Sequence, residues 1–183
     1  MAQTRHDGAV AETDGLRPLL DAAREGDDVA VRELVRRTQP VVWRLCEALG
    51  SAGEVDDLVQ ETYLRALSAF DAYRADAPVQ PWLLSIARRV CADHVRRRIR
   101  QRKLVDRISR STVPSEPPLL EGLTDLLGVL AHDRREAFVM TQVVGLSYVD
   151  AAAVVGCPIG TIRSRVARAR SDLLMALRAS EAV

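Results

Sequence analysis

The segment 104–122, LVDRISRSTVPSEPPLLEG, constrains the fold of this chain more than any other stretch of its sequence. It contains three prolines, three serines and little periodicity, which is typical of a flexible connector. On both sides of it, apolar residues recur at the spacing of amphipathic helices. The sequence therefore predicts two separate helical domains rather than a single one.

The predicted boundaries follow from this division. Residues 1–15 lack periodicity and are expected to form a disordered N-terminal tail. The first helical domain is predicted from residue 16 to 103 and the second from 123 to 178. Neither strand alternation nor an internal repeat is found, so the predicted fold class is all-α. Within the first domain, breaks are expected at Gly26, Pro40, residues 50–53 and residues 77–81.

Length and composition exclude several classes of protein. A chain of 183 residues with 4% aromatic content can form one or two small domains, but not a large enzyme with a deep core. No apolar run approaches the roughly 20 residues that cross a bilayer, so a cytoplasmic protein without a membrane span or signal peptide is expected. The sequence contains no paired catalytic carboxylates, nucleophile elbow, phosphate loop or metal cluster, so no enzymatic activity, cofactor or metal is expected.

The number and spacing of the cysteines favour neither disulfide bonds nor a metal site. Cys46, Cys91 and Cys157 are odd in number and far apart, which fits reduced thiols rather than a disulfide framework. Cys91 and His94 have a spacing that metal ligands can use, but no second pair stands near them. We therefore expect buried small side chains, with a zinc site as the alternative.

The stretch 146–170, LSYVDAAAVVGCPIGTIRSRVARAR, has the pattern of a helix, a tight turn and a second helix. Ser147 and Asp150 form a start that resembles a capping box, and Gly156 is expected to end the first helix. The second helix has an apolar stripe formed by Ile162, Val166, Ala169 and Leu173. Its opposite face carries Ser164, Ala167, Arg168 and Ser171, with Arg163 and Arg165 on the flanks.

Arginine is concentrated in this second helix, with four arginines in the eight positions from 163 to 170. A narrow apolar stripe opposite Ser and Arg, entered through a short turn, is the layout of a DNA recognition helix. Arginine binds phosphates and also the edges of guanines. The alternative is a solvated basic helix in an arginine-rich chain, in which Lys103 is the only lysine. The capped first helix and the turn spacing favour recognition.

The stretch 56–70, DDLVQETYLRALSAF, predicts a helix with two different faces. Val59, Tyr63, Ala66 and Phe70 fall on one side and suit a core. The other side combines carboxylates with an apolar residue, a pattern that fits a protein partner with a basic helix. The alternative is an ordinary solvated helix with one stray leucine. This second face consists of Asp57, Gln60, Glu61 and Leu64.

A basic helix is predicted to follow from Pro81. It has two apolar lines, one through Leu83, Ile86, Ala87 and Val90 and one through Leu84, Cys91 and Val95, so packing on two sides is expected. Nine Arg or Lys residues lie between 88 and 107. Tyr73, Arg74 and Trp82 border the preceding loop, and rings with cations suit single-stranded nucleic acid. In the competing interpretation, Trp82 belongs to the core and the arginines only hold phosphates.

Three motifs in this order, DDLVQETYLRAL, PWLLSIARRVCADHVRRR and GLSYVDAAAVVGCPIGTIRSRVARAR, resemble the extracytoplasmic-function sigma factors of the sigma-70 family. The resemblance spans roughly residues 19–178 and implies a sigma-2 helical bundle and a sigma-4 helix-turn-helix domain. It implies a protein that binds core RNA polymerase, directs it to promoters and promotes their opening. The implied partners are the beta-prime clamp helices and beta flap of the polymerase, promoter DNA, and an anti-sigma factor as a candidate.

The resemblance also implies residue roles. The polymerase surface would be Asp57, Gln60, Glu61 and Leu64. Minus-ten DNA would be held by Tyr73, Arg74, Trp82, Arg88, Arg89, Arg96 and Arg97, and minus-thirty-five DNA by Arg163, Ser164, Arg165 and Arg168. The main alternative is a polymerase-independent helix-turn-helix regulator, which leaves the acidic face and the Trp82 loop without a role. A helical adaptor for RNA or for an acidic protein is a further alternative.

Overall fold

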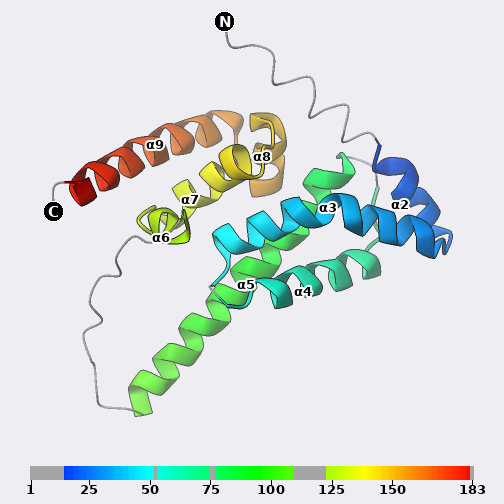
Figure 1. Cartoon of the computed structure of the whole chain (residues 1–183), viewed down its shortest axis with the longest axis horizontal. Helices are drawn as coiled ribbons and strands as arrows, with labels where there is room; N and C mark the ends of the chain where they lie inside the picture. Colours follow the sequence, from blue (N-terminus) through cyan, green and yellow to red (C-terminus); the bar gives the residue numbers. More distant parts are fainter. Residues whose placement is uncertain (1–14, 52, 75–76, 109–122, 182–183) are drawn as a thin grey trace, which may run out of the picture.

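The structure is a computed structural model that describes residues 15–51, 53–74, 77–108 and 123–181. Every regular element in these ranges is helical (Figure 1). The predicted all-α class with two helical blocks is therefore confirmed. The predicted tail lies outside the described residues except for Gly15, and most of the predicted connector lies outside them too.

The first block consists of α2 (Arg17–Arg24), α3 (Asp28–Leu49), α4 (Val55–Ser68) and α5 (Val79–Ile108). A turn at Gly26, whose φ of 93° favours glycine, separates α2 from α3. Asp27 then caps α3, because its carboxylate accepts bonds from the backbone N–H groups of Val29 and Ala30. Both α3 and α4 pack on α5, so the prediction that the basic helix is packed on two sides is confirmed.

The break predicted at Pro40 is wrong, because α3 continues through it. A proline inside a helix removes one hydrogen bond and costs about 3 kcal/mol or more. The residues that follow bury a continuous apolar face, which includes Val41, Val42 and Leu45. Burial of such side chains contributes about 1.5–3 kcal/mol each, enough to outweigh the defect. At the other end of this block, α5 extends beyond Lys103 into the segment predicted as connector.

The second block consists of α6 (Leu123–Gly128), α7 (His132–Phe138), the π-helix η1 (Val139–Val143), α8 (Tyr148–Val155) and α9 (Ile159–Glu181). The start of α8 is as predicted, since the Ser147 hydroxyl accepts a bond from the Asp150 N–H at 3.0 Å. Its end is as predicted as well, since Gly156 has the left-handed φ of 76° that ends many helices. In η1 the turn is wide, with the Val144 N–H bonded to the Val139 carbonyl at 2.9 Å.

The two blocks pack against each other across a seam. Helix α3 contacts α6 and η1, and α5 contacts α8. Buried residues of both blocks belong to one hydrophobic cluster. In Figure 1, the second block lies against one side of the first block, next to α3 and α5. Residues far apart in the sequence are therefore joined at the seam, and the basic helix α5 faces the second block.

Candidate polymerase and nucleic-acid interfaces

The acidic face of α4 is where the sequence predicted it. Asp57 and Gln60 are exposed, and Leu64 is 55% exposed. Glu61 is half-buried and accepts a bond from Arg65 Nε at 2.7 Å. Leu67, one turn beyond Leu64, is also exposed and was not predicted. The result is a carboxylate and amide surface with an accessible apolar centre, which suits docking by a basic helix.

The opposite face of α4 is anchored in the block. Val59 and Ala66 are buried as predicted. The hydroxyl of Tyr63 lies 2.8 Å from the hydroxyl of Thr38 on α3, and burial raises the pKa of Tyr63 to about 12. Because α4 is fixed on this side, its acidic face is presented on a rigid support.

Aromatic rings cluster at the loop before α5. The centroid of the Trp82 ring lies 5.1 Å from that of the Tyr73 ring and 6.2 Å from that of the Phe70 ring. Tyr73 is buried, and its hydroxyl donates to the Ala77 carbonyl at 2.5 Å. Trp82 is half-buried and packs on the core, whereas Arg74 is exposed. The Trp82 ring thus packs on the core and is still partly accessible to solvent. The buried Tyr73 ring contacts it from the side of the core.

The basic surface of α5 contains arginines in different states. Arg89 and Arg97 are exposed and have no polar partner among the described residues. Arg96 is exposed and donates to Asp93 at 2.5 Å. Arg96 and then Arg65 hold the pKa of the Asp93 carboxyl below its usual value. Exposed guanidiniums without a carboxylate partner are the ones best able to bind phosphates.

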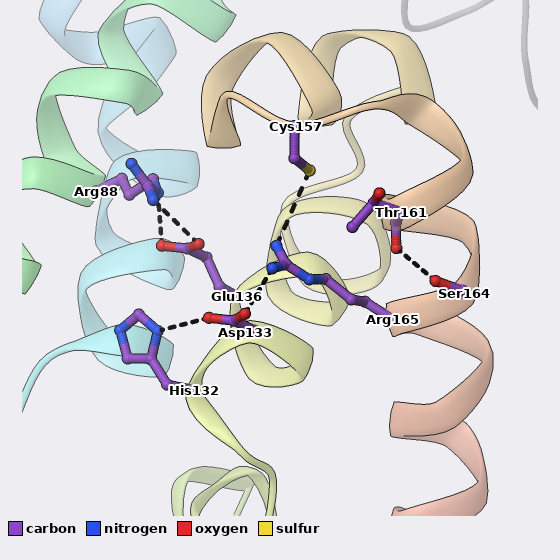
Figure 2. A network of polar contacts seen from close by, with 8 residues as sticks. All are labelled: Arg88, His132, Asp133, Glu136, Cys157, Thr161, Ser164 and Arg165. Carbon is purple, nitrogen blue, oxygen red and sulfur yellow. Dashed lines mark hydrogen bonds and ion pairs between the residues drawn. The ribbon is translucent and has the colours of Figure 1, made fainter.

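Arg88 differs from these because it is bound across the seam (Figure 2). Its Nε donates to Glu136 Oε1 at 2.5 Å and its Nη2 to Glu136 Oε2 at 3.1 Å. Such a bidentate pair of hydrogen bonds between a guanidinium and a carboxylate is charge-assisted and geometrically specific. The Glu136 side chain, on α7, is only 5% exposed. Arg88, which was predicted to bind DNA, is therefore already paired with a carboxylate of the second block.

Sequence reasoning missed Glu136, although a signal was present. Glu136 lies four residues before Met140 and one before Ala137, and all three are buried. A carboxylate at a core-facing position requires a partner, because an unpaired buried charge is costly. The partner itself could not be deduced, since the arrangement of the blocks was not predictable from the motifs.

Arg135 provides a second bond across the seam. Its Nε donates to the Ala48 carbonyl near the end of α3 at 2.8 Å, and burial lowers the pKa of its guanidinium. Beside it lies a cavity of about 230 Å³ between the end of α3, α5 and α7. This volume is below the range of about 300–1,000 Å³ that is typical of pockets for small-molecule ligands.

The second block presents α9 as predicted. Ile162, Val166 and Ala169 of the apolar stripe are buried. Its outer face carries five exposed residues, Arg163, Ser164, Ala167, Arg168 and Ser171. The Ser164 hydroxyl donates to the Thr161 carbonyl at 3.0 Å.

Arg165 is the exception among the predicted α9 residues. It is half-buried, and its Nη2 donates to Asp133 Oδ2 of α7 at 2.5 Å. Its Nη1 donates to Cys157 Sγ in the turn before α9 at 3.9 Å. Asp133 was not identified from the sequence, and Arg165 faces α7 and this turn rather than the outer face of α9 (Figure 2).

The cysteines lie largely as expected. Cys46 and Cys91 are buried, whereas Cys157 is half-buried. Contact with Cys46 and burial raise the pKa of the Cys91 thiol, which disfavours the thiolate that binds metals. His94 lies against Glu54. Within the described residues, no group of three or more His, Cys, Asp or Glu could hold a metal ion. Nor is any helix there long and apolar enough to cross a membrane.

Two family models match the chain. The model described as sigma-70 region 2 matches residues 34–101, and the one described as sigma-70 region 4 matches residues 120–173. These ranges contain, respectively, the acidic face of α4 with the basic part of α5, and the helix-turn-helix of α8 and α9.

Individual relatives agree. The chain is 42% identical to the ECF RNA polymerase sigma factor SigC of Mycobacterium tuberculosis over 90% of its length and 92% of that protein. It is similar to CnrH in complex with the cytosolic domain of CnrY, with a TM-score of 0.71, 30% identity, and coverage of 89% and 97%. It is also similar to sigma factor RpoE with the anti-sigma factor NepR from Bartonella quintana, with a TM-score of 0.68, 31% identity, and coverage of 80% and 96%.

Proposed function

The chain belongs to the extracytoplasmic-function sigma factors of the sigma-70 family, and from this premise we propose how its surfaces divide the work. It directs core RNA polymerase to particular promoters and promotes their opening. This function excludes the two alternative interpretations of the sequence, a polymerase-independent regulator and a helical adaptor. We expect the protein to do no covalent chemistry itself, because the polymerase forms the phosphodiester bonds.

The acidic face of α4 is the proposed docking surface for the beta-prime clamp helices. Its support is the combination of exposed Asp57, Gln60 and Leu64 with the half-buried Glu61 on one helix. Leu67 extends its apolar centre. An apolar anchor within a charged rim gives affinity from the anchor and orientation from the charges.

The test of this assignment is the double substitution Asp57→Arg and Glu61→Arg. It is expected to abolish promoter-dependent transcription with core polymerase, because two carboxylates opposite a basic partner become like charges. The matched control is Glu25→Arg with Asp28→Arg, which changes the net charge equally at exposed positions elsewhere. The assignment fails if both double variants transcribe equally well while both remain helical by circular dichroism.

Melted minus-ten DNA is the proposed ligand of the loop and of α5. Trp82 offers a partly accessible ring, and Arg74, Arg89 and Arg97 offer exposed cations. Bases stack on rings while cations follow the backbone. Arg96 would exchange its bond with Asp93 for a phosphate. The proposed role of Tyr73 is to hold Trp82 from below, because its own ring is buried.

Arg88 belongs to the same proposed surface, but it is available only after Glu136 withdraws. The packed arrangement of the two blocks is then a form that must open before minus-ten DNA can reach Arg88. Promoter DNA and polymerase favour the open form to the extent that they bind it more tightly. The solved relatives CnrH and RpoE are bound to CnrY and NepR. We propose an anti-sigma factor as a further partner of this chain.

Helix α9 is the proposed reader of the minus-thirty-five element. Its exposed Arg163, Ser164 and Arg168 suit the major groove, where an arginine fork on a guanine contributes about 1–3 kcal/mol of discrimination. Two modest half-sites on one chain raise the effective concentration of the second contact. The two blocks together would thereby select a promoter that neither selects alone.

A further inference from the structure

The four arginines of α9 between residues 163 and 170 are not equivalent. Arg163 and Arg168 are exposed, and neither has a polar partner among the described residues. Arg170 donates to Gln142 Oε1 at 2.8 Å. Arg165 alone among these four has both of its terminal nitrogens bound to protein groups.

The partners of Arg165 come from two different elements. Asp133 lies in the first turn of α7, and Cys157 lies in the turn between α8 and α9 (Figure 2). One guanidinium therefore connects three parts of the second block: α7, the turn and α9. The Arg165 side chain is 23% exposed and points to this junction.

This geometry conflicts with a role in base contact. A guanine edge is recognised by two parallel N–H groups of one guanidinium. In Arg165 the two Nη groups donate to Asp133 and Cys157. The other N–H groups of the guanidinium are not used in these bonds, but the group faces α7 and the turn, so it would have to turn away from both partners before its fork could face DNA.

We propose that Arg165 is a positioning residue, which sets the angle of the recognition helix through Asp133 and Cys157, and that base discrimination belongs to Arg163 and Arg168. This proposal rests on the proposed function of α9 as the reader of minus-thirty-five DNA. The angle matters because a recognition helix places its side chains in the groove only at the correct tilt relative to its supporting helices.

The decisive variant is Asp133→Asn, tested in the full chain bound to core polymerase. If Arg165 positions α9, loss of its anchor lowers affinity for every minus-thirty-five sequence by a similar factor, about two- to threefold, as expected for a partly exposed ion pair. If Arg165 instead contacts DNA, Asp133 competes with DNA for it, and Asp133→Asn raises affinity. The direction of the change relative to Asp172→Asn, which removes the same charge from another ion pair between α7 and α9, separates the two roles. Asp133→Glu keeps a carboxylate and should recover most of the loss.

The measurement is binding of the holoenzyme to duplexes with each base of the minus-thirty-five element varied in turn. Arg165→Gln should lower affinity uniformly and leave the rank order of sequences unchanged. Arg163→Gln and Arg168→Gln should change that order. A phosphate contact by Arg165 would reduce the slope of log affinity against log salt by about 1 on substitution. The positioning role changes this slope by much less than 1, because only a partly exposed ion pair is lost.

Asp172→Asn is the matched control. It also removes a carboxylate charge from an ion pair between α7 and α9, since Arg134 Nη1 lies 2.6 Å from Asp172 Oδ2, but it does not involve the turn. It should reduce affinity less than Asp133→Asn does. The proposal is overturned by a change of base preference in Arg165→Gln, or by an Asp133→Asn protein that binds as tightly as the parent. If the unaltered holoenzyme shows no minus-thirty-five preference, the proposed function of α9 fails instead.

Discussion

Two ion pairs of α7 allow a direct comparison within one helix. Glu136 holds Arg88 of the first block, and Asp133 holds Arg165 of the second block. The two arginine side chains are similarly covered, at 25% and 23% exposed. The carboxylates differ greatly, at 5% for Glu136 and 63% for Asp133. This difference shows that the contribution of each pair to stability depends on the burial of the carboxylate rather than on the presence of an arginine.

Loss of Arg88 should have the largest effect, because it leaves the buried Glu136 carboxylate without a counter-charge. Arg88→Ala is expected to destabilise the closed seam by about 3 kcal/mol, the lower end of the range for breaking a buried pair, since Arg88 is partly exposed. Opening of the seam would return the carboxylate to water. Hydrogen exchange of the α7 amides should then become about a hundredfold faster.

A double variant sharpens this result. Arg88→Leu with Glu136→Leu replaces the pair with apolar groups and should restore the seam to within about 1 kcal/mol of the parent. If the single and double variants exchange equally fast, the loss is one of packing and not of charge. An Arg88→Ala protein with unchanged exchange would contradict the whole comparison.

Loss of Arg135 should have an intermediate effect. Arg135→Met removes the bond to the Ala48 carbonyl, but it also removes a guanidinium whose lowered pKa reports unfavourable burial of its charge. These contributions oppose each other, so a net loss of about 1 kcal/mol is expected. Urea denaturation of the full chain measures this loss of stability. A loss as large as that of Arg88→Ala would contradict the intermediate rank of Arg135.

Loss of Asp133 should have the smallest effect on stability. Exposed ion pairs contribute about 0–1 kcal/mol, so Asp133→Ala is expected to lower the free energy of unfolding by about 0.5 kcal/mol. Added salt should remove this difference while it leaves the Arg88 effect largely intact, because buried pairs are screened less. Urea denaturation at low and high salt tests both statements. A salt-independent loss would place Asp133 in the same class as Glu136.

The local patterns of this fold were predictable because they depend on residues close in sequence. The buried stripe of α9 and the cap at Ser147 follow from helical spacing and hydrogen-bond geometry alone. The acidic face of α4 was found in the same way. The continuation of α3 through Pro40 was not predictable, since a local penalty was outweighed by tertiary packing.

The candidate site was predictable only in part. The outward positions of Arg163, Ser164 and Arg168 follow from the periodicity of one helix. The pairing of Arg88 and Arg165 does not, because their partners come from α7, whose own sequence does not show which arginine either carboxylate contacts. Sequence spacing shows which side chains share a face, but a partner on another element requires the packing.

The wide turn of η1 has a consequence for how this chain can vary in length. A π-turn holds one residue more than an α-turn, so the segment Val139–Val143 carries a surplus residue just before the loop that leads to α8. A one-residue deletion there can close the turn as ordinary α-helix and leave the later helices in place. The same deletion within α8 would rotate everything after it by about 100°. A one-residue deletion should therefore be tolerated better at η1 than within α8.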